Sequence, residues 1–329
     1  MTTEDVVREE IARQTGQTSP THGPVLVGIG DAALSEQRDA VDFAVSEANW
    51  RHSDLVLVHG CEPLVTLTAL TPTMTPSERF SAGEGIVAVV AEYASTRLSP
   101  DRKIRTFVSE GSGAQALLDL ADRAALIVCQ RRMVSVAHRW HTGSTTSRLC
   151  ARSEAPVAVI KQGGTHEAAS GVVVGVDGRG HSAMAVDTAM VEAAVRGQQL
   201  TAVHAWEPPV PLGATGYVPP CDDELDLLRD RAAAVLADVL SDARVGETGV
   251  IVEPLVVRGP AAAALLDASR SAVLLVVSRH AGHGVGSLGL GSVARQVLGK
   301  ALCPVIVTPP SRRPRRQRSV HHERSAAVP

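Results

Sequence analysis

The chain has 329 residues, of which 44% are hydrophobic and 20% charged, and this composition is typical of a soluble globular protein with room for two domains. A formal net charge of −3 provides no overall field that would draw the chain to nucleic acid or to a membrane surface. Its five cysteines are scattered, its first residues are acidic, and no long apolar run is present, so we expect a cytoplasmic protein without disulfides or a membrane span.

After an N-terminal extension, residues 1–22, one unit is written twice. The segment VLVGIGD at 25–31 returns as VVVGVDG at 172–178, and LVLVHGCEP at 55–63 returns as LTAVHAWEP at 200–208. Four later pairs are each 148 residues apart: Gly111 and Gly259, Leu117 and Leu265, Gly143 and Gly291, and Pro156 and Pro304. The repeat predicts two domains of the same fold, which we place at 23–162 and 170–309, with a linker at 163–169 and a tail at 310–329.

Each copy alternates short apolar runs with helical patterns. In the second copy the runs are VVVGV, LTAVHAW, VIVEPLVV, AVLLVV and PVIVTP, and their branched, unalternating residues predict parallel strands covered on both faces. Among the helices between them, one is expected to be capped by Ser182 and to end at Gly197, and another to run from about Ser292 to Lys300. We therefore predict two tandem flavodoxin-like (Rossmann-like) α/β domains, each an open five-stranded parallel sheet with helices on both faces.

Five glycines lie in SRHAGHGVGSLGLGSVARQ, residues 278–296, directly after the fourth strand of the second copy. In such sheets ligands bind outside the carboxyl ends of the strands, where the strand order reverses. Glycines let a phosphate approach the backbone N–H groups at the positive end of the following helix. The G-x-G-x-x-G at Gly284, Gly286 and Gly289 is not read as a dinucleotide fingerprint, because no acidic residue follows at the required spacing, and a Walker A ending is also missing.

The repeated motifs together resemble the universal stress protein family in two tandem copies. They are VVVGVDG on the first strand, AVHAWEP on the second, GLGSVARQV after the fourth and CPVIVTP on the last. ATP-binding members of that family have G-x2-G-x9-G-S/T after the fourth strand and an Asp that closes the first strand. Gly291, Ser292 and Asp177 match this pattern, whereas Val277 replaces the first glycine and His280 or Ala281 the second.

The resemblance implies a nucleotide site in the second copy. In it, Asp177 would hold ribose hydroxyls or a phosphate-bound Mg²⁺, Ala205 would line the adenine pocket, and the backbone of 291–293 would bind the phosphates. The full set of expected binding residues is Gly175, Asp177, Ala205, Gly282, Gly284, Gly291, Ser292 and Val293. A carboxylate suits Mg²⁺ and helix N–H groups suit a polyanion. The alternative is that Asp177 only forms a turn and Gly291 only a helix cap.

The first copy departs further from the family pattern. Gly30 stands at the position of Asp177, although Asp31 follows it as a substitute. The loop CQRRMVSVAHRWHTGSTTSRL keeps Gly143 and Ser144 but has lost the early glycines, and its bulky Met133, His138 and Trp140 would crowd a phosphate. Arg131 and Arg132 either attract an anion or belong to a solvated basic loop. We expect the second copy to bind nucleotide and the first mainly to support it.

Other signals favour structural interpretations. The pairs His138/His141 and His280/His283 lack a third ligand, so a metal site is not expected there. His59 and His204 correspond between the copies and are interpreted as packing or pocket-edge residues. The basic tail SRRPRRQRSVHHER is predicted to be disordered, the alternative being contact with acidic lipid or nucleic acid, for which it lacks stacking aromatics.

No catalytic arrangement is recognisable, since the Gly-rich loop contains no G-x-S-x-G nucleophile elbow. The expected function is therefore binding of ATP or a related adenine nucleotide, with Mg²⁺, as a regulatory or sensing ligand in a stress response. The alternatives are a nucleotide-free scaffold that dimerises and a weak ATPase. The resemblance also favours pairing along the last strands, either as a homodimer or between the two copies of one chain, with no dedicated nucleic-acid site.

Overall fold

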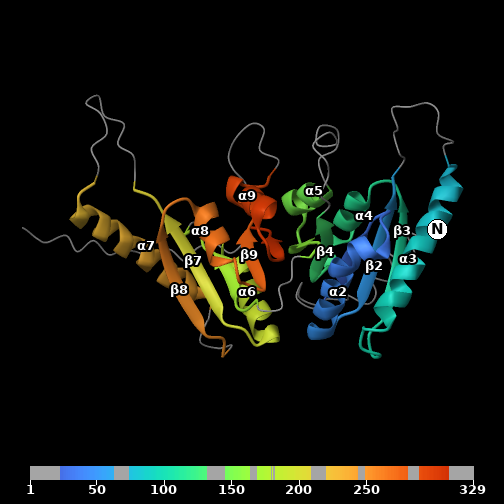
Figure 1. Ribbon diagram of the computed structural model, residues 1–329, viewed down its shortest axis with the longest axis horizontal. Helices are drawn as coiled ribbons and strands as arrows, with labels where there is room; N and C mark the ends of the chain where they lie inside the picture. The colour runs from blue at the N-terminus through green and yellow to red at the C-terminus, as the bar shows by residue number, and fades with distance from the viewer. Residues whose placement is uncertain are drawn as a thin grey trace, which may run out of the picture.

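The structure is a computed structural model that describes residues 23–62, 74–131, 145–163, 169–178, 180, 182–208, 220–243, 249–280 and 289–310. Within these ranges strands and helices alternate along both copies (Figure 1). The N-terminal extension, Gly282, Gly284 and the basic tail beyond Pro310 lie outside the described residues, so the predictions made for them stay predictions.

Among the described residues, each copy contains five strands. The first copy has β1 (Val25–Ile29), α2 (Leu34–Trp50), β2 (Leu55–Cys61), α3 (Pro76–Ser95), β3 (Ile104–Glu110), α4 (Gly113–Asp119), the 3-10 turn η2 (Ala121–Arg123), β4 (Leu126–Arg131), α5 (Thr145–Arg152) and β5 (Val157–Lys161). The second copy has β6 (Val172–Gly175), α6 (Ala183–Arg196), β7 (Leu200–Trp206), α7 (Asp222–Asp242), β8 (Val252–Arg258), α8 (Ala261–Ala268), β9 (Leu274–Ser278), α9 (Ser292–Lys300) and β10 (Val305–Thr308).

The helix ends follow the sequence signals. The prediction of a last helix over Ser292–Lys300 is confirmed. Helix α6 ends at Gly197, which has the left-handed conformation (φ 60°) that glycine adopts without strain. Helix α7 begins after Cys221, whose backbone N–H donates to the Glu224 carboxylate (3.0 Å), so an acidic side chain satisfies an amide at the positive end of the helix.

The strands form one sheet in the order β3-β2-β1-β4-β5-β10-β9-β6-β7-β8. Within each half all neighbours are parallel, which confirms the doubly wound α/β class. The order 3-2-1-4-5 in each half is the Rossmann-like variant of that class, whereas flavodoxin itself has 2-1-3-4-5. The halves join where β5 and β10 pair antiparallel, with Val157 opposite Val307 and Val159 opposite Val305. The two predicted sheets are therefore halves of a single sheet.

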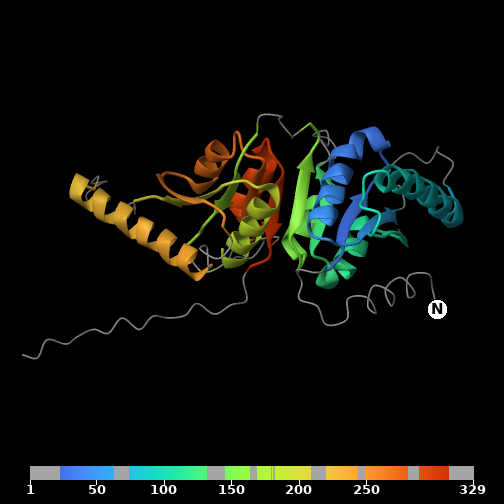
Figure 2. The same cartoon turned by 90° about the horizontal axis from the view of Figure 1, so that it is seen from below.

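Helices cover both faces of this sheet and enclose two hydrophobic layers (Figure 2). One layer lies under α2, α3, α6 and α7, and the other under α4, α5, α8 and α9. Strand β8 departs from the predicted covering on both faces, because Glu253, Pro254 and Leu255 are exposed. Since β8 is an edge strand, Pro254 can lie there although it has no N–H group to donate.

The same strand-to-helix contact occurs in both copies. A Cβ atom on Gly28 of β1 would lie 2.9 Å from Leu117 Cδ1, and one on Gly175 of β6 would lie 3.1 Å from Leu265 Cδ1. These glycines let α4 and α8 approach the sheet closely. Gly175, which the family resemblance places in the nucleotide site, therefore has a packing role that is shared with the first copy.

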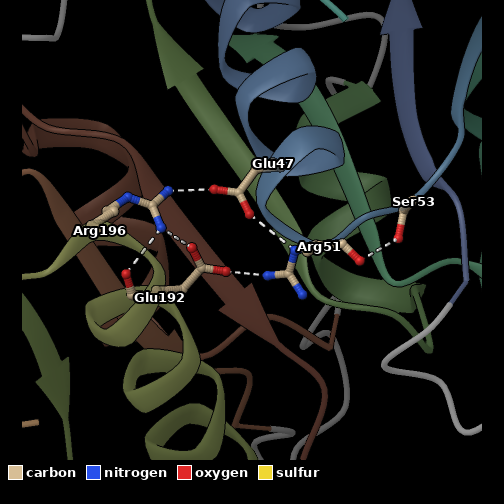
Figure 3. A network of polar contacts seen from close by, with 5 residues as sticks. All are labelled: Glu47, Arg51, Ser53, Glu192 and Arg196. Carbon is tan, nitrogen blue, oxygen red and sulfur yellow. Dashed lines mark hydrogen bonds and ion pairs between the residues drawn. The ribbon is translucent and has the colours of Figure 1, made fainter. Parts of the chain in front are cut away.

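A buried network of ion pairs joins the two copies on one face of the sheet (Figure 3). Arg51 of the first copy pairs with Glu47 one turn earlier (3.0 Å) and with Glu192 of the second copy. Arg196 pairs in the same way with Glu192 and with Glu47. Both carboxylates are fully buried, and burial together with the nearby Glu47 carboxylate raises the pKa of Glu192 to about 7. Each charge thus has one partner in each copy, so the network requires both.

Candidate functional site

The strand order reverses between β1 and β4 in the first copy and between β6 and β9 in the second. The carboxyl ends of these two strand pairs are therefore the places where this fold binds ligands. In the second copy Asp177 follows the end of β6 and His280 follows the end of β9. Their side chains meet, with Asp177 Oδ2 lying 3.7 Å from His280 Nδ1. An accessible carboxylate thus stands at the second reversal point.

Ser182 fixes the orientation of this carboxylate. The Ser182 hydroxyl donates to Asp177 Oδ1 (2.6 Å) and accepts a hydrogen bond from the backbone N–H of Asp177 (2.8 Å). Ser182 precedes the first residue of α6 as predicted, but it makes no side-chain bond to that helix. The hydroxyl instead closes the turn between β6 and α6, so Oδ1 is held while Oδ2 faces the end of β9.

The N-terminus of α9 reaches the same place. Gly291 precedes the helix in an extended conformation (φ −61°, ψ 162°), and a Cβ atom on it would lie 3.1 Å from the His280 carbonyl oxygen. The first turn of α9 contains no acidic residue, and Ser292 is exposed. Amides in a first helical turn have no partner within the helix and carry partial positive charge. His280 therefore lies between the Asp177 carboxylate, which faces its ring, and Gly291, which lies close to its backbone before an anion-attracting helix end.

The structure brings only part of the predicted set together. Asp177 and Gly291 meet through His280, and Ser292 and Val293 begin α9. Ala205 lies near the carboxyl end of β7, within the strand that the run LTAVHAW predicts, and is paired with Val257 of β8. His280 was considered only as half of an H-x-x-H pair and as a replacement for a motif glycine, so its position between Asp177 and Gly291 was missed.

The described residues fit a polyphosphate with a bound Mg²⁺. A fixed carboxylate oxygen is a suitable ligand for Mg²⁺, and the N-terminal amides of α9 are suitable donors to phosphate oxygens. A hollow of about 560 Å³ lies elsewhere, at the start of α3, where Glu84 and Glu110 contribute to its walls. Two carboxylates make that hollow a poor place for a phosphate, because like charges repel.

In the first copy the equivalent backbone is held by the protein's own side chain. The Gly30 N–H donates to Gln37 Oε1 (3.0 Å), and Gln37 Nε2 donates to the carbonyl of Ala32 (2.8 Å). Gln37 is buried and occupies the position on α2 that Ser182 occupies before α6. Asp31, the substitute carboxylate, is 77% exposed and lies 3.7 Å from His59 Nε2, beside β2 and not beside β4.

The wall next to this point is closed in the first copy. Gly60 corresponds to Ala205, and a Cβ atom on Gly60 would lie only 2.1 Å from the backbone nitrogen of Gly113, where α4 begins. No real Cβ atom fits there, so the backbone of the first copy fills the space that a methyl group occupies in the second. The side chain that the resemblance assigns to the adenine pocket, Ala205, therefore has no counterpart in the first copy.

The two corresponding histidines serve the backbone. His59 Nδ1 lies 2.9 Å from the Ile29 carbonyl, and His204 Nδ1 lies 2.8 Å from the Val176 carbonyl. Each ring thus ties the second strand of its copy to the end of the first, in agreement with a packing or pocket-edge role. His138, His141 and His283 lie outside the described residues, which themselves contain no cluster of three or more His, Cys, Asp or Glu side chains suited to a metal ion.

Arg131 belongs neither to an anion site nor to a solvated loop. Its guanidinium donates from Nη1 to the Leu298 carbonyl (2.6 Å) and from Nη2 to the Gly299 carbonyl (2.8 Å), both at the end of α9 in the other copy. One signal for this contact was present in the repeat, since Arg131 and Arg279 are 148 residues apart. Arg132 lies outside the described residues.

The fold and the site define a class: a tandem, doubly wound α/β protein with a candidate polyanion site at one of its two reversal points. The model of the Universal stress protein family matches residues 22–161 and 170–309, so the chain belongs to this family. Among the helices that the structure describes, none has the length and apolar character needed to cross a membrane.

The relatives agree over almost their whole length. A universal stress protein of Mycolicibacterium smegmatis is 28% identical over 300 residues, which cover 89% of this chain and 99% of the relative. The Mycobacterium tuberculosis universal stress protein Rv2005c is 30% identical over 296 residues, covering 87% and 96%. A crystal structure of a universal stress protein from Archaeoglobus fulgidus has the same fold, with a TM-score of 0.63 at 14% identity over 89% of this chain and 98% of that one.

Proposed function

We propose that the second copy binds ATP or a related adenine nucleotide, together with Mg²⁺, and that this binding regulates a cytoplasmic stress-response protein without dedicated catalysis. One observation carries the proposal: at the reversal point between β6 and β9, the Asp177 carboxylate lies 3.7 Å from the His280 ring, and the His280 backbone lies close to Gly291, the residue before α9. A cation ligand and a set of anion-attracting amides are thereby adjacent.

Each residue has a distinct part in this proposal. Asp177 Oδ2 faces the Mg²⁺ ion or the ribose hydroxyls, while Ser182 keeps Oδ1 in place. The amides of 291–293 and the Ser292 hydroxyl face the phosphates, and Ala205 faces the adenine. Nucleotide binding to the folded chain alone would stabilise it by mass action, which is how occupancy could bias a partner surface.

The test is calorimetric titration of the full chain with Mg-ATP. We expect about one site per chain, and we expect Asp177→Ala to weaken binding roughly tenfold or more, since it removes a charge-assisted contact. Asp31→Ala is the matched control, because Asp31 is the exposed carboxylate after β1 in the first copy, and it should leave binding unchanged. Two equivalent sites, or an unaffected Asp177→Ala variant, would contradict the proposal.

The two alternatives give different results in companion measurements. A nucleotide-free scaffold shows no thermal shift with Mg-ATP, and a weak ATPase releases phosphate at a rate that Asp177→Ala reduces. The last strands, which a dimerising scaffold was expected to use, pair with each other in the chain. A scaffold would therefore need another surface, and this favours nucleotide binding over the scaffold.

A further inference from the structure

The reversal point of the second copy is connected to the first copy through α9. This helix has nine residues, and its N-terminus is the proposed phosphate-binding end. The helix lies at the seam between the copies, opposite α5 (Figure 1). The last carbonyls of any helix lack partners within it. Here two of them, at Leu298 and Gly299, accept hydrogen bonds from Arg131 at the end of β4 in the first copy.

We propose that Arg131 is a positioning residue for the nucleotide site of the other copy, an inference that rests on the proposed function. Its two N–H groups hold α9 from the end opposite the site, and its positive charge complements the negative end of the helix dipole. Because α9 is short, its ends cannot move independently. Fixing Leu298 and Gly299 therefore also fixes the direction in which the amides at Ser292 and Val293 point relative to Asp177.

The reciprocal contact shows that this support is unequal. Arg279, the counterpart of Arg131, is buried and donates from Nη1 to the Ser153 carbonyl just after α5. Among the residues that the structure describes, Arg279 makes this one side-chain hydrogen bond, of 3.2 Å, whereas Arg131 makes two, of 2.6 and 2.8 Å. Helix α5 follows the loop of the first copy, where no nucleotide is expected. The stronger arginine contact is thus made to the helix of the copy that is proposed to bind.

The experiment compares nucleotide affinity and helix protection in full-length variants. Mg-ATP and inorganic tripolyphosphate are titrated calorimetrically, and amide hydrogen exchange is followed in the ligand-free chain. We expect Arg131→Met to weaken the binding of both ligands roughly three- to tenfold, which is the range for a well-placed charge at a helix end. Arg131→Lys should lose less affinity, because lysine keeps the positive charge although it lacks the planar guanidinium. In ligand-free Arg131→Met, amide hydrogen exchange should be faster in α9 but unchanged in β5 and β10.

Lys300→Met is the matched control. It removes an exposed positive charge from the last turn of α9 without touching the contact to β4, and it should change either affinity less than twofold. Equal losses of affinity in Arg131→Met and Lys300→Met would show that the effect comes from positive charge in general. This result would overturn the proposed positioning role of Arg131. Unchanged affinity in Arg131→Met would overturn it as well, while leaving the proposed function intact. A wild-type chain that binds neither ligand would instead refute the proposed function, and this inference with it.

Discussion

The two copies have the same packing but different reversal points, and the difference shows which residues a duplicated fold must keep. Gly28 and Gly175 make the same close contact with a helix, and His59 and His204 bind the same carbonyl. At the reversal points, however, Gly30 is bonded by Gln37, whereas Asp177 presents a carboxylate. Two copies that fold alike therefore share their packing contacts, whereas the residues at a reversal point can differ without changing the fold.

The ion-pair network at the seam between the copies is nearly symmetric, and the first prediction tests that symmetry. Arg196→Met and Arg51→Met should each lower the free energy of unfolding by about 3–5 kcal/mol, since each leaves buried carboxylates without one of their partners. Urea denaturation of the full chain measures the effect. Arg196 also lies over the Trp50 ring, 4.5 Å from its centroid, so its variant should be the more damaging of the two.

The pH dependence provides the control for this prediction. The pKa of Glu192 is about 7 in the folded chain and its ordinary value is 4.5, so the folded state holds a proton between these values that the unfolded state has released. Stability from this group therefore falls as the pH rises through that window. Losing an arginine partner should therefore lower the free energy of unfolding more at pH 8, where the Glu192 carboxylate is charged, than at pH 5. An equal loss at both pH values would show that charge burial is not the cause.

The second prediction concerns the wall beside each reversal point. Gly60→Ala should lower the free energy of unfolding by about 1–3 kcal/mol, because the new methyl group collides with the backbone of Gly113. The converse change, Ala205→Gly, removes a methyl group from β7 and should lower it by only about 0.5–1 kcal/mol. Thermal or urea denaturation of both variants measures the difference. Equal effects would mean that the two walls are alike, and the contrast between the copies would fail at this point.

Sequence reasoning found what depends on local pattern and missed what depends on contacts across the chain. Apolar runs and helix signals predicted the doubly wound class and the limits of α9, because these follow from neighbouring residues. The hydrogen bonds at the C-terminal end of α9 could not be predicted in this way, because Arg131 donates them to carbonyls that are 167 and 168 residues away in the sequence. An E-x-x-x-R pattern occurs at the end of both α2 and α6, at Glu47/Arg51 and Glu192/Arg196. It could be read from the sequence, but its role in joining the copies follows only from their pairing in the structure.

For the candidate site, too, the sequence indicated residues that match a motif but did not indicate the contacts between their side chains. Asp177, Gly291 and Ser292 were found because they match a motif, and the structure brings the first two together. Ser182 was identified as a helix cap from its position alone, and its bond to Asp177 depends on how the turn after β6 folds back. His280 carried no signal of its own in a loop that departs from the family pattern. Side-chain direction in turns is what the sequence could not supply.

The smallest effect is expected where the missing carboxylate is restored to the first copy. Gly30→Asp should create no second Mg-ATP site, and titration should still give about one site per chain. The carboxylate of Asp177 depends on the Ser182 hydroxyl, but the equivalent Gln37 already donates its amide to the Ala32 carbonyl. A new carboxylate at position 30 would therefore lack a donor to hold it.

A carboxylate alone also cannot reopen the wall of the first copy, because the backbone of Gly113 remains against Gly60. If Gly30→Asp nevertheless gave two sites, the closed wall would be irrelevant to binding, and one substitution would account for the whole difference between the copies. If it gave one site, as expected, a carboxylate at position 30 would not be sufficient to create a site in the first copy. The comparison would then rest on the geometry around the reversal point and not on the identity of a single residue.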